Sequence, residues 1–259
     1  MLGAICGDVI GSVHEWGATK FTHFYPLIAD DARVTDDTVL TCAVAEAVLS
    51  GGDHAAHLRT FARRHPRAGY GGNFRRWFTS DDAGPYQSWG NGSAMRVSPV
   101  GWAFDSEDEV LEAARASAVV THSHPEGVKG AQAVALAVFR ARTGAGKDAM
   151  REEIMARFGY DLARTLAEIR PRYCFEVSCQ KSVPEALIAF FEATSYEAAV
   201  RNAVSLGGDA DTQAAIAGSV AEAFFGPVPA AIADPVRARL SADLADVLDR
   251  FTERYPPAA

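Results

Sequence analysis

Residues 38–49 read TVLTCAVAEAVL, and the spacing of their apolar side chains indicates the fold class. Val39, Ala43 and Ala47 recur every four residues, which places them on one face of an α-helix. In the run at 235–250, Pro235 lies in the first turn, where its missing N–H costs nothing. Stretches of β-branched residues with period two are nearly absent, so we expect an all-α protein. Further Ala-rich amphipathic runs lie at 107–120, 126–142, 183–192, 196–206, 211–225 and 235–250.

The composition is that of an ordinary globular protein. Of 259 residues, 48% are hydrophobic and 22% charged, which excludes a disordered or collagen-like chain. The chain has 25 Lys and Arg against 33 Asp and Glu, a net charge of −8. This balance argues against a nucleic-acid backbone as the main partner, because phosphate binding needs a basic face. Gly- and Pro-rich segments are short and no repeat or linker is visible, so we expect one compact domain over residues 1–259.

No apolar run reaches the roughly eighteen residues that a membrane helix needs. The N-terminal stretch MLGAICGDVIGSV lacks a basic region and contains Asp8, so we do not interpret it as a signal peptide. The cysteines are too few to cross-link a chain of this length, and we expect free thiols in a reducing compartment. We therefore expect a cytoplasmic protein and, without a long exposed heptad pattern, a monomer. The four cysteines are Cys6, Cys42, Cys174 and Cys179.

Two acidic clusters stand directly before apolar helical runs, TDDT at 35–38 and GDADT at 208–212. Asp and Thr are natural N-caps, and capping is one interpretation of each residue. One cap needs only one side chain, however, and the surplus carboxylates would repel each other unless a cation neutralises them. Oxygen ligands without His or Cys suit Mg²⁺ or Mn²⁺. Carboxylates from two helix starts could hold two such ions, as in binuclear hydrolytic sites.

Two glycine-rich segments, GYGGN at 69–73 and GNGS at 90–93, each precede an expected helix. Glycine lets backbone N–H groups turn toward an anion, and a helix N-terminus adds partial positive charge. A diphosphate would fit such loops, while ordinary tight turns are the alternative. Tyr86 and Trp89 beside the second loop could stack on a base, although aromatic side chains in loops more often fill the core.

Five segments follow one another along the chain: GD at 7–8 leading to Glu15, TDDT at 35–38, GNGSAMR at 90–96, TH at 121–122 and GGDADT at 207–212. Taken together, they resemble the ADP-ribosylglycohydrolase family, which includes dinitrogenase-reductase-activating glycohydrolase and the ADP-ribosyl-acceptor hydrolases. The resemblance covers the chain from about residue 3 to about residue 225. It implies an orthogonal all-α fold with two Mg²⁺ or Mn²⁺ ions at the bottom of a cleft. It also implies an enzyme that removes mono-ADP-ribose from an acceptor.

The resemblance further implies roles for individual residues. Asp211 is implied as the bridge between the ions, and Asp36, Asp37 and Glu15 as the candidate catalytic acids. The implied metal ligands are Thr35, Asp36, Asp37, Asp209, Asp211 and Thr212. The implied substrate contacts are Glu15 at the cleaved ribose, Gly71, Gly72 and Ser93 at the diphosphate, Ser88 and Trp89 at the adenine, the loop Gly90, Asn91 and Gly92, and His122.

The sequence does not identify the acceptor. An arginine N-glycoside is the first choice, by resemblance to the arginine-directed members. Serine O-glycosides, O-acetyl-ADP-ribose and ADP-ribose linked to nucleic-acid bases fit the same sugar-side site. The substrate would be an ADP-ribosylated protein or a small ADP-ribose conjugate.

Two other classes of function compete with a glycohydrolase. A non-catalytic ADP-ribose-binding module is disfavoured because all six implied ligands are present. A binuclear nucleotide phosphohydrolase is disfavoured because GNGSAMR at 90–96, with Trp89 before it, favours an intact nucleoside diphosphate as ligand. Residues 171–181 match no family role, and we expect them to border the cleft.

Overall fold

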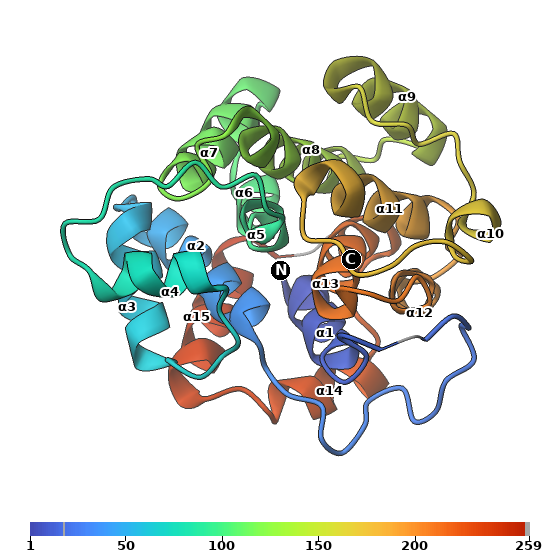
Figure 1. Cartoon of the computed structure of the whole chain (residues 1–259), viewed down its shortest axis with the longest axis horizontal. Coiled ribbons are helices and arrows are strands. Elements are labelled where there is room, and N and C mark those ends of the chain that lie inside the picture. The colour runs from blue at the N-terminus through green and yellow to red at the C-terminus, as the bar shows by residue number, and fades with distance from the viewer. Residues whose placement is uncertain (18, 257–259) are drawn as a thin grey trace.

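The computed structural model describes residues 1–17 and 19–256, and within these ranges it contains fifteen helices and no strand. The predicted all-α fold is thereby confirmed (Figure 1). The helices are α1 (Leu2–Gly11), α2 (Asp36–Ser50), α3 (His54–Arg64), α4 (Gly72–Thr79), α5 (Gly92–Met95), α6 (Ser98–Ala103), α7 (Glu107–Val119), α8 (Pro125–Arg142), α9 (Lys147–Phe158), α10 (Leu166–Ile169), α11 (Cys179–Phe191), α12 (Tyr196–Val204), α13 (Ala210–Phe225), α14 (Ala230–Arg237) and α15 (Ala242–Arg254).

Six of the seven predicted runs correspond to single helices, namely α2, α7, α8, α11, α12 and α13. The prediction of one helix over 235–250 is wrong. Two helices replace it, and Pro235 lies inside α14 rather than in a first turn. The physical reason is that α14 packs against α1 whereas α15 packs against α2, so one straight helix could not reach both.

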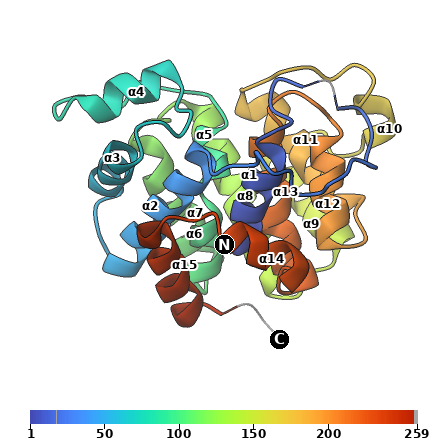
Figure 2. The same ribbon diagram turned by 90° about the horizontal axis from the view of Figure 1, so that it is seen from below.

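Helices α1 and α13 pack along each other at the centre of the molecule (Figure 2). A Cβ on Gly7 would lie 2.1 Å from the carbonyl oxygen of Ala214, and one on Gly11 would lie 2.4 Å from the Cα of Asp211. Only glycine permits so close an approach of two backbones. The close packing brings Asp8, the neighbour of Gly7, toward the first turn of α13.

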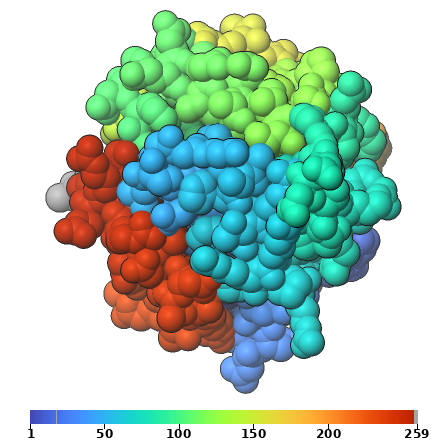
Figure 3. Space-filling view, turned by 90° about the vertical axis from the view of Figure 1, so that its left-hand side faces the viewer, coloured from blue at the N-terminus to red at the C-terminus, as the bar shows by residue number. Residues whose placement is uncertain are grey.

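Further helices pack against α2 and α13. Helix α2 packs against α3 and α15, and Figure 3 shows the face of the molecule where the red C-terminal segment lies against the blue and cyan segments. Helices α8, α11 and α12 pack against α13. None of the helices in the described part of the chain is long and apolar enough to cross a membrane. All four cysteines are free, as predicted, and only Cys174 is exposed.

Candidate active site

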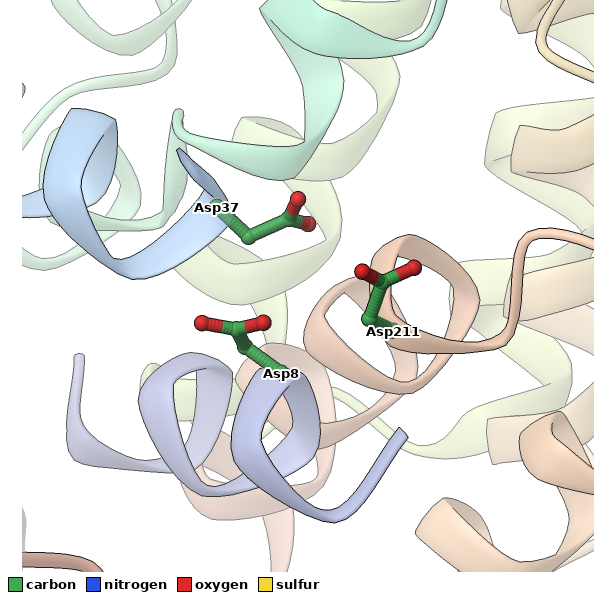
Figure 4. Close-up of side chains that lie close together, drawn as sticks. All are labelled: Asp8, Asp37 and Asp211. Atoms are coloured by element: carbon green, nitrogen blue, oxygen red, sulfur yellow. The ribbon is translucent and has the colours of Figure 1, made fainter. Parts of the chain in front are cut away.

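Three carboxylates from three helices point toward one another at the centre of the molecule: Asp8 on α1, Asp37 on α2 and Asp211 on α13 (Figure 4). One oxygen atom of each lies within 4.8 Å of the other two. All three side chains are buried, and burial is the main cause that raises the pKa of each carboxyl. Asp37 Oδ1 has no hydrogen-bond partner within the described part of the chain. A buried carboxylate oxygen that lacks a donor is stabilised by a cation, so Asp37, with Asp211 beside it, could bind a metal ion.

A second group of carboxylates shares Asp211 with the first. One oxygen each of Glu15, Asp209 and Asp211 lies within 4.8 Å of the others. Glu15 is half-buried, and its pKa is raised by burial and then by the negative charge of Asp209. A carboxylate that belongs to two acidic groups has the position expected of a bridge between two ions.

Asp8 was not assigned a site role from the sequence, although it belongs to the GD segment at 7–8 that carries the family resemblance. Its Oδ1 accepts a 2.6 Å hydrogen bond from the Thr35 hydroxyl. Its Oδ2 accepts from the backbone N–H groups of Thr35 at 3.1 Å and Thr38 at 3.2 Å, and from the Thr38 hydroxyl. The carboxylate thus lies at the N-terminus of α2, where negative charge is favourable. An isolated Asp in an otherwise apolar helix was the available sequence signal.

The first turns of α2 and α13 are held by further polar contacts. Thr35 is the N-cap of α2, and its hydroxyl oxygen accepts from the N–H of Asp37 at 3.3 Å, so the capping interpretation is correct for this residue. The Thr212 hydroxyl donates to Asp37 Oδ2 at 3.3 Å. The side-chain amide of Asn91 donates to Asp209 Oδ2 at 2.7 Å. These bonds join the two acidic clusters to each other and to the Gly-Asn-Gly loop.

A cavity of about 500 Å³ opens above the carboxylates. All predicted site residues lie in the described part of the chain, and all of them line this cavity except Thr35 and Ser93. Ser93 is fully buried and donates its hydroxyl proton to the Gly127 carbonyl at 2.7 Å, so the structure does not bring it to the cleft as predicted. The predicted residues that line the cavity are Glu15, Asp36, Asp37, Gly71, Gly72, Ser88, Trp89, Gly90, Asn91, Gly92, His122, Asp209, Asp211 and Thr212.

The glycine segments form one wall of this cavity. Gly71 is the N-cap of α4, and nothing lies within 4 Å of where its Cβ or that of Gly72 would stand. This open space leaves both backbones accessible to a ligand. Gly69, with φ of +108°, lies against Asp36, because its Cβ would be 3.3 Å from Asp36 Oδ1. The wall therefore joins a possible anion site to the acidic cluster.

His122 lines the cavity as a neutral imidazole. Its Nδ1 lies 2.7 Å from the Thr121 hydroxyl, which accepts a 2.9 Å hydrogen bond from Arg96 Nη2. Burial and the charge of Arg96 hold the pKa of His122 well below its ordinary value. A neutral imidazole has one N–H donor and one acceptor nitrogen, so His122 can orient a ligand without adding charge.

Several cavity-lining residues were not assigned by the sequence reasoning. Residues 171–181 border the cleft as expected, through Phe175 and Val177. Trp16 and the buried Arg96 also line the cavity, and so does Tyr86, which the sequence had suggested only as a ring that could stack on a base. Trp16 follows Glu15 directly, but nothing in the sequence distinguishes an aromatic residue in a cleft from one in the core.

A family model described as ADP-ribosylglycohydrolase matches residues 1–258. The chain belongs to the ADP-ribosylglycohydrolase family. The family resemblance deduced from the five sequence segments is confirmed. As a member of this family the chain is a glycohydrolase.

Curated relatives include the ADP-ribosylhydrolase ARH3 of Mus musculus, 27% identical over 87% of this chain and 82% of the mouse protein. The ARH3 protein of Homo sapiens is 26% identical over 87% of this chain and 84% of its own length. A solved structure titled ADP-ribosylglycohydrolase-related protein complex aligns with a TM-score of 0.68 at 24% identity, over 98% of this chain and 97% of that chain. This last likeness supports the fold of the ADP-ribosylglycohydrolase family.

Proposed function

We propose that this glycohydrolase cleaves the bond between C1″ of ADP-ribose and an acceptor, preferring an arginine N-glycoside, and that it requires two divalent cations. The observation that carries the proposal is the pair of carboxylate groups that share Asp211 beneath a cavity lined by two glycine segments. The substrate would be an ADP-ribosylated protein or a small ADP-ribose conjugate. The monomeric state and the cytoplasmic location stay predictions.

The residues present fit a pair of Mg²⁺ or Mn²⁺ ions. Asp37 Oδ1 is buried and receives no hydrogen bond from any described residue. The atoms available to bind a metal ion are carboxylate and hydroxyl oxygens, which Mg²⁺ and Mn²⁺ prefer. Asp8 already accepts four hydrogen bonds, so its part is to position Thr35 and the start of α2. When bound, the ions supply positive charge that holds the ribose hydroxyls and lowers the pKa of water. The ligands that we propose are Thr35, Asp36, Asp37, Asp209, Asp211 and Thr212.

Three carboxylates are candidates for the proton acceptor. Asp37 is buried among other carboxylates, whereas Asp36 and Glu15 are half-buried beside the cavity. Burial and the charge of Asp8 raise the pKa of Asp36 to about 8. We favour Glu15, because Asp36 and Asp37 are among the proposed metal ligands, whereas Glu15 is not and its half-buried carboxylate is available to accept a proton from the attacking water. The remaining carboxylates stabilise the positive charge that develops on the ribose as the glycosidic bond breaks.

The rest of ADP-ribose would follow the wall of glycine segments. Backbone N–H groups at Gly71 and Gly72, together with the start of α4, face the diphosphate. The loop Gly90 to Gly92 lines the same cavity, and His122 orients the substrate through its single N–H. Trp89, with 50% of its surface exposed, offers a face on which adenine stacks next to Ser88.

The test is a panel of linkages. Arginine-linked, serine-linked and guanine-linked mono-ADP-ribose and O-acetyl-ADP-ribose are incubated with the protein in Mg²⁺ or in EDTA, and free ADP-ribose is measured by mass. We expect release from the arginine linkage that EDTA abolishes. Release of phosphate without ADP-ribose would instead indicate a nucleotide phosphohydrolase. Release that is unchanged in EDTA would contradict the proposed role of the carboxylate groups.

A further inference from the structure

An exposed aromatic pair lies at the edge of the cavity, next to the acidic groups. The rings of Trp16 and Phe175 are stacked, with centroids 3.9 Å apart and an angle of 12° between their planes. Both residues line the cavity, yet 72% of Trp16 and 37% of Phe175 are exposed. An indole so exposed contributes little to the core. One face of the indole meets Phe175, and its large exposed area leaves the other side accessible to a ligand.

Both aromatic residues are fixed to the backbone that precedes Asp209. The N–H of Trp16 donates to the carbonyl of Gly208 at 3.2 Å. A Cβ on Gly208, whose φ is +83°, would lie 3.0 Å from the Cα of Phe175. Lys20 donates to the Tyr173 carbonyl at 2.6 Å and to the Leu206 carbonyl, and so connects the segments that carry the two rings. Figure 2 shows these segments, blue and gold, running side by side.

The backbone of Trp16 is strained, with φ of +63°, a region that bulky side chains rarely occupy. Such a conformation persists only where the surrounding structure supports it, and it is concentrated at functional sites. Glu15 immediately precedes Trp16, and its carboxylate lies within 4.8 Å of those of Asp209 and Asp211. The indole is therefore held beside the group that we propose acts on the scissile bond.

The charges around the aromatic pair favour a cation. Five carboxylates line the cavity, and four of them, Asp36, Asp37, Asp209 and Asp211, are proposed ligands of the two cations, which leaves the carboxylate of Glu15, the neighbour of Trp16, for the acceptor. Among the described residues that line it, Arg96 is the one permanent cation, and its side chain is fully buried. A ligand on the exposed face of Trp16 thus meets an aromatic ring and a neighbouring carboxylate. A guanidinium group suits both, because it stacks on aromatic faces and donates forked hydrogen bonds to carboxylates.

We propose that Trp16 and Phe175 form the acceptor subsite and that this subsite takes the planar guanidinium of an ADP-ribosylated arginine. The inference rests on the proposed function and adds to it the residues that select the acceptor. A serine acceptor carries neither a planar group nor a positive charge and gains nothing from the pair. A nucleobase would stack on the rings but lacks the charge that the carboxylates favour.

The experiment measures KM and kcat of the Trp16→Ala and Phe175→Ala variants for arginine-linked and serine-linked ADP-ribose. We expect the KM for the arginine linkage to rise about tenfold, which is about 1.4 kcal/mol of binding free energy, without a change in the KM for the serine linkage. Trp16→Phe, which keeps a ring, retains most of the arginine preference. The matched control is Phe21→Ala, which removes an exposed aromatic residue of the same segment that is not among the described residues lining the cavity.

A second readout uses the acceptor side alone. Agmatine is tested as an inhibitor of hydrolysis against 1,4-diaminobutane, which has the same alkyl chain and lacks the guanidinium. We expect agmatine to inhibit the wild-type protein more strongly, and Trp16→Ala to remove the difference. Trp89→Ala, which alters the other exposed indole of the cavity, should raise the KM for both linkages and leave the agmatine preference intact.

The results separate the subsite from the proposed function. If no linkage releases ADP-ribose, the proposed function fails. If ADP-ribose is released but Trp16→Ala and Phe175→Ala change both linkages equally, the acceptor subsite is overturned. The acceptor subsite is also overturned if these two variants change the KM for a guanine linkage only, or if agmatine and 1,4-diaminobutane inhibit the wild-type protein equally.

Discussion

The side-chain amide of Asn91 donates a 2.7 Å hydrogen bond to Asp209 Oδ2, between two buried residues 118 positions apart in the sequence. The backbone N–H of Asn91 donates to the Val177 carbonyl at 2.7 Å. One residue therefore connects the Gly-Asn-Gly loop, the acidic loop before α13 and the segment that borders the cleft. Because of these bonds, the proposed diphosphate loop and the proposed metal loop hold a fixed relation to each other.

Replacing Asn91 by Ala should weaken this connection. Asp209 loses a donor that lowers its pKa, so protons compete more strongly with a divalent cation. We expect a loss of about 1.5–3 kcal/mol of unfolding free energy and a higher Mg²⁺ concentration for half-maximal activity. Asn202→Ala, which removes a hydrogen bond to the Ala189 carbonyl, is the control and should leave the Mg²⁺ requirement unchanged. An unaltered Mg²⁺ requirement in Asn91→Ala would contradict this role.

Replacing Asp8 should lower the stability of the metal-free protein, whereas replacing Asp211 should not. Asp8→Ala leaves the donors of Thr35 and Thr38 without their acceptor, at a cost of about 3 kcal/mol or more. Asp211→Asn removes a charge that repels its neighbours and keeps an oxygen for the Thr212 N–H, so stability should rise or stay constant. Thermal unfolding in EDTA measures both. A large loss of stability in Asp211→Asn would show that this carboxylate is structural.

The contact between α1 and α13 predicts the effect of a single methyl group. Gly7→Ala places a Cβ 2.1 Å from the Ala214 carbonyl oxygen, so the two helices must separate. We expect a destabilisation of about 1–3 kcal/mol and weaker Mg²⁺ binding, because Asp8, which positions Thr35 and the start of α2, moves relative to Asp211 when the helices separate. Gly146→Ala meets nothing within 4 Å and serves as the control. Denaturant unfolding of both variants measures the difference, and equal stabilities would contradict the close packing.

The acidic groups also predict how stability depends on pH. The pKa of Asp36 is raised from 3.8 to about 8 in the folded protein, so the folded state holds this proton over a range where the unfolded state has lost it. Stability contributed by this group is therefore present below pH 3.8 and is lost as the pH rises toward about 8.

Mg²⁺ reverses this loss, because it binds the charged carboxylates. Its stabilising effect should grow between pH 5 and pH 8, measured by thermal unfolding with and without the ion. Asp36→Asn should flatten the pH dependence measured in EDTA. An effect of Mg²⁺ that is independent of pH would show that the ion does not bind at these carboxylates.

Much of the helical architecture was predictable because Ala-rich faces repeat with the period of a helix, as in α2, α8 and α13. Helix α1 was not predicted, since a helix buried on all sides shows no polar face. The break between α14 and α15 depends on which helix each one packs against, and a local pattern does not carry that information.

The same distinction applies to the site. Pairs of acidic residues at helix starts could be singled out as candidate site residues, because surplus adjacent carboxylates repel each other, and the structure places these pairs in the lining of one cavity. Asp8 could not be assigned, since its role depends on donors from Thr35 and Thr38 about thirty positions later. Ser93 was predicted to reach the cleft and does not, whereas Trp16 lines the cleft and was not predicted. The direction of a side chain, toward Gly127 for Ser93 and toward the cleft for Trp16, is set by tertiary packing.

The most direct test of the central claim is the release of ADP-ribose from an arginine linkage by the wild-type protein and by Asp211→Asn, each in Mg²⁺ and in EDTA. We predict that the wild-type protein releases ADP-ribose in Mg²⁺ but not in EDTA, and that the folded Asp211→Asn variant releases none in either condition. Release by Asp211→Asn at the wild-type rate would contradict the assignment of the shared carboxylate as the centre of the active site.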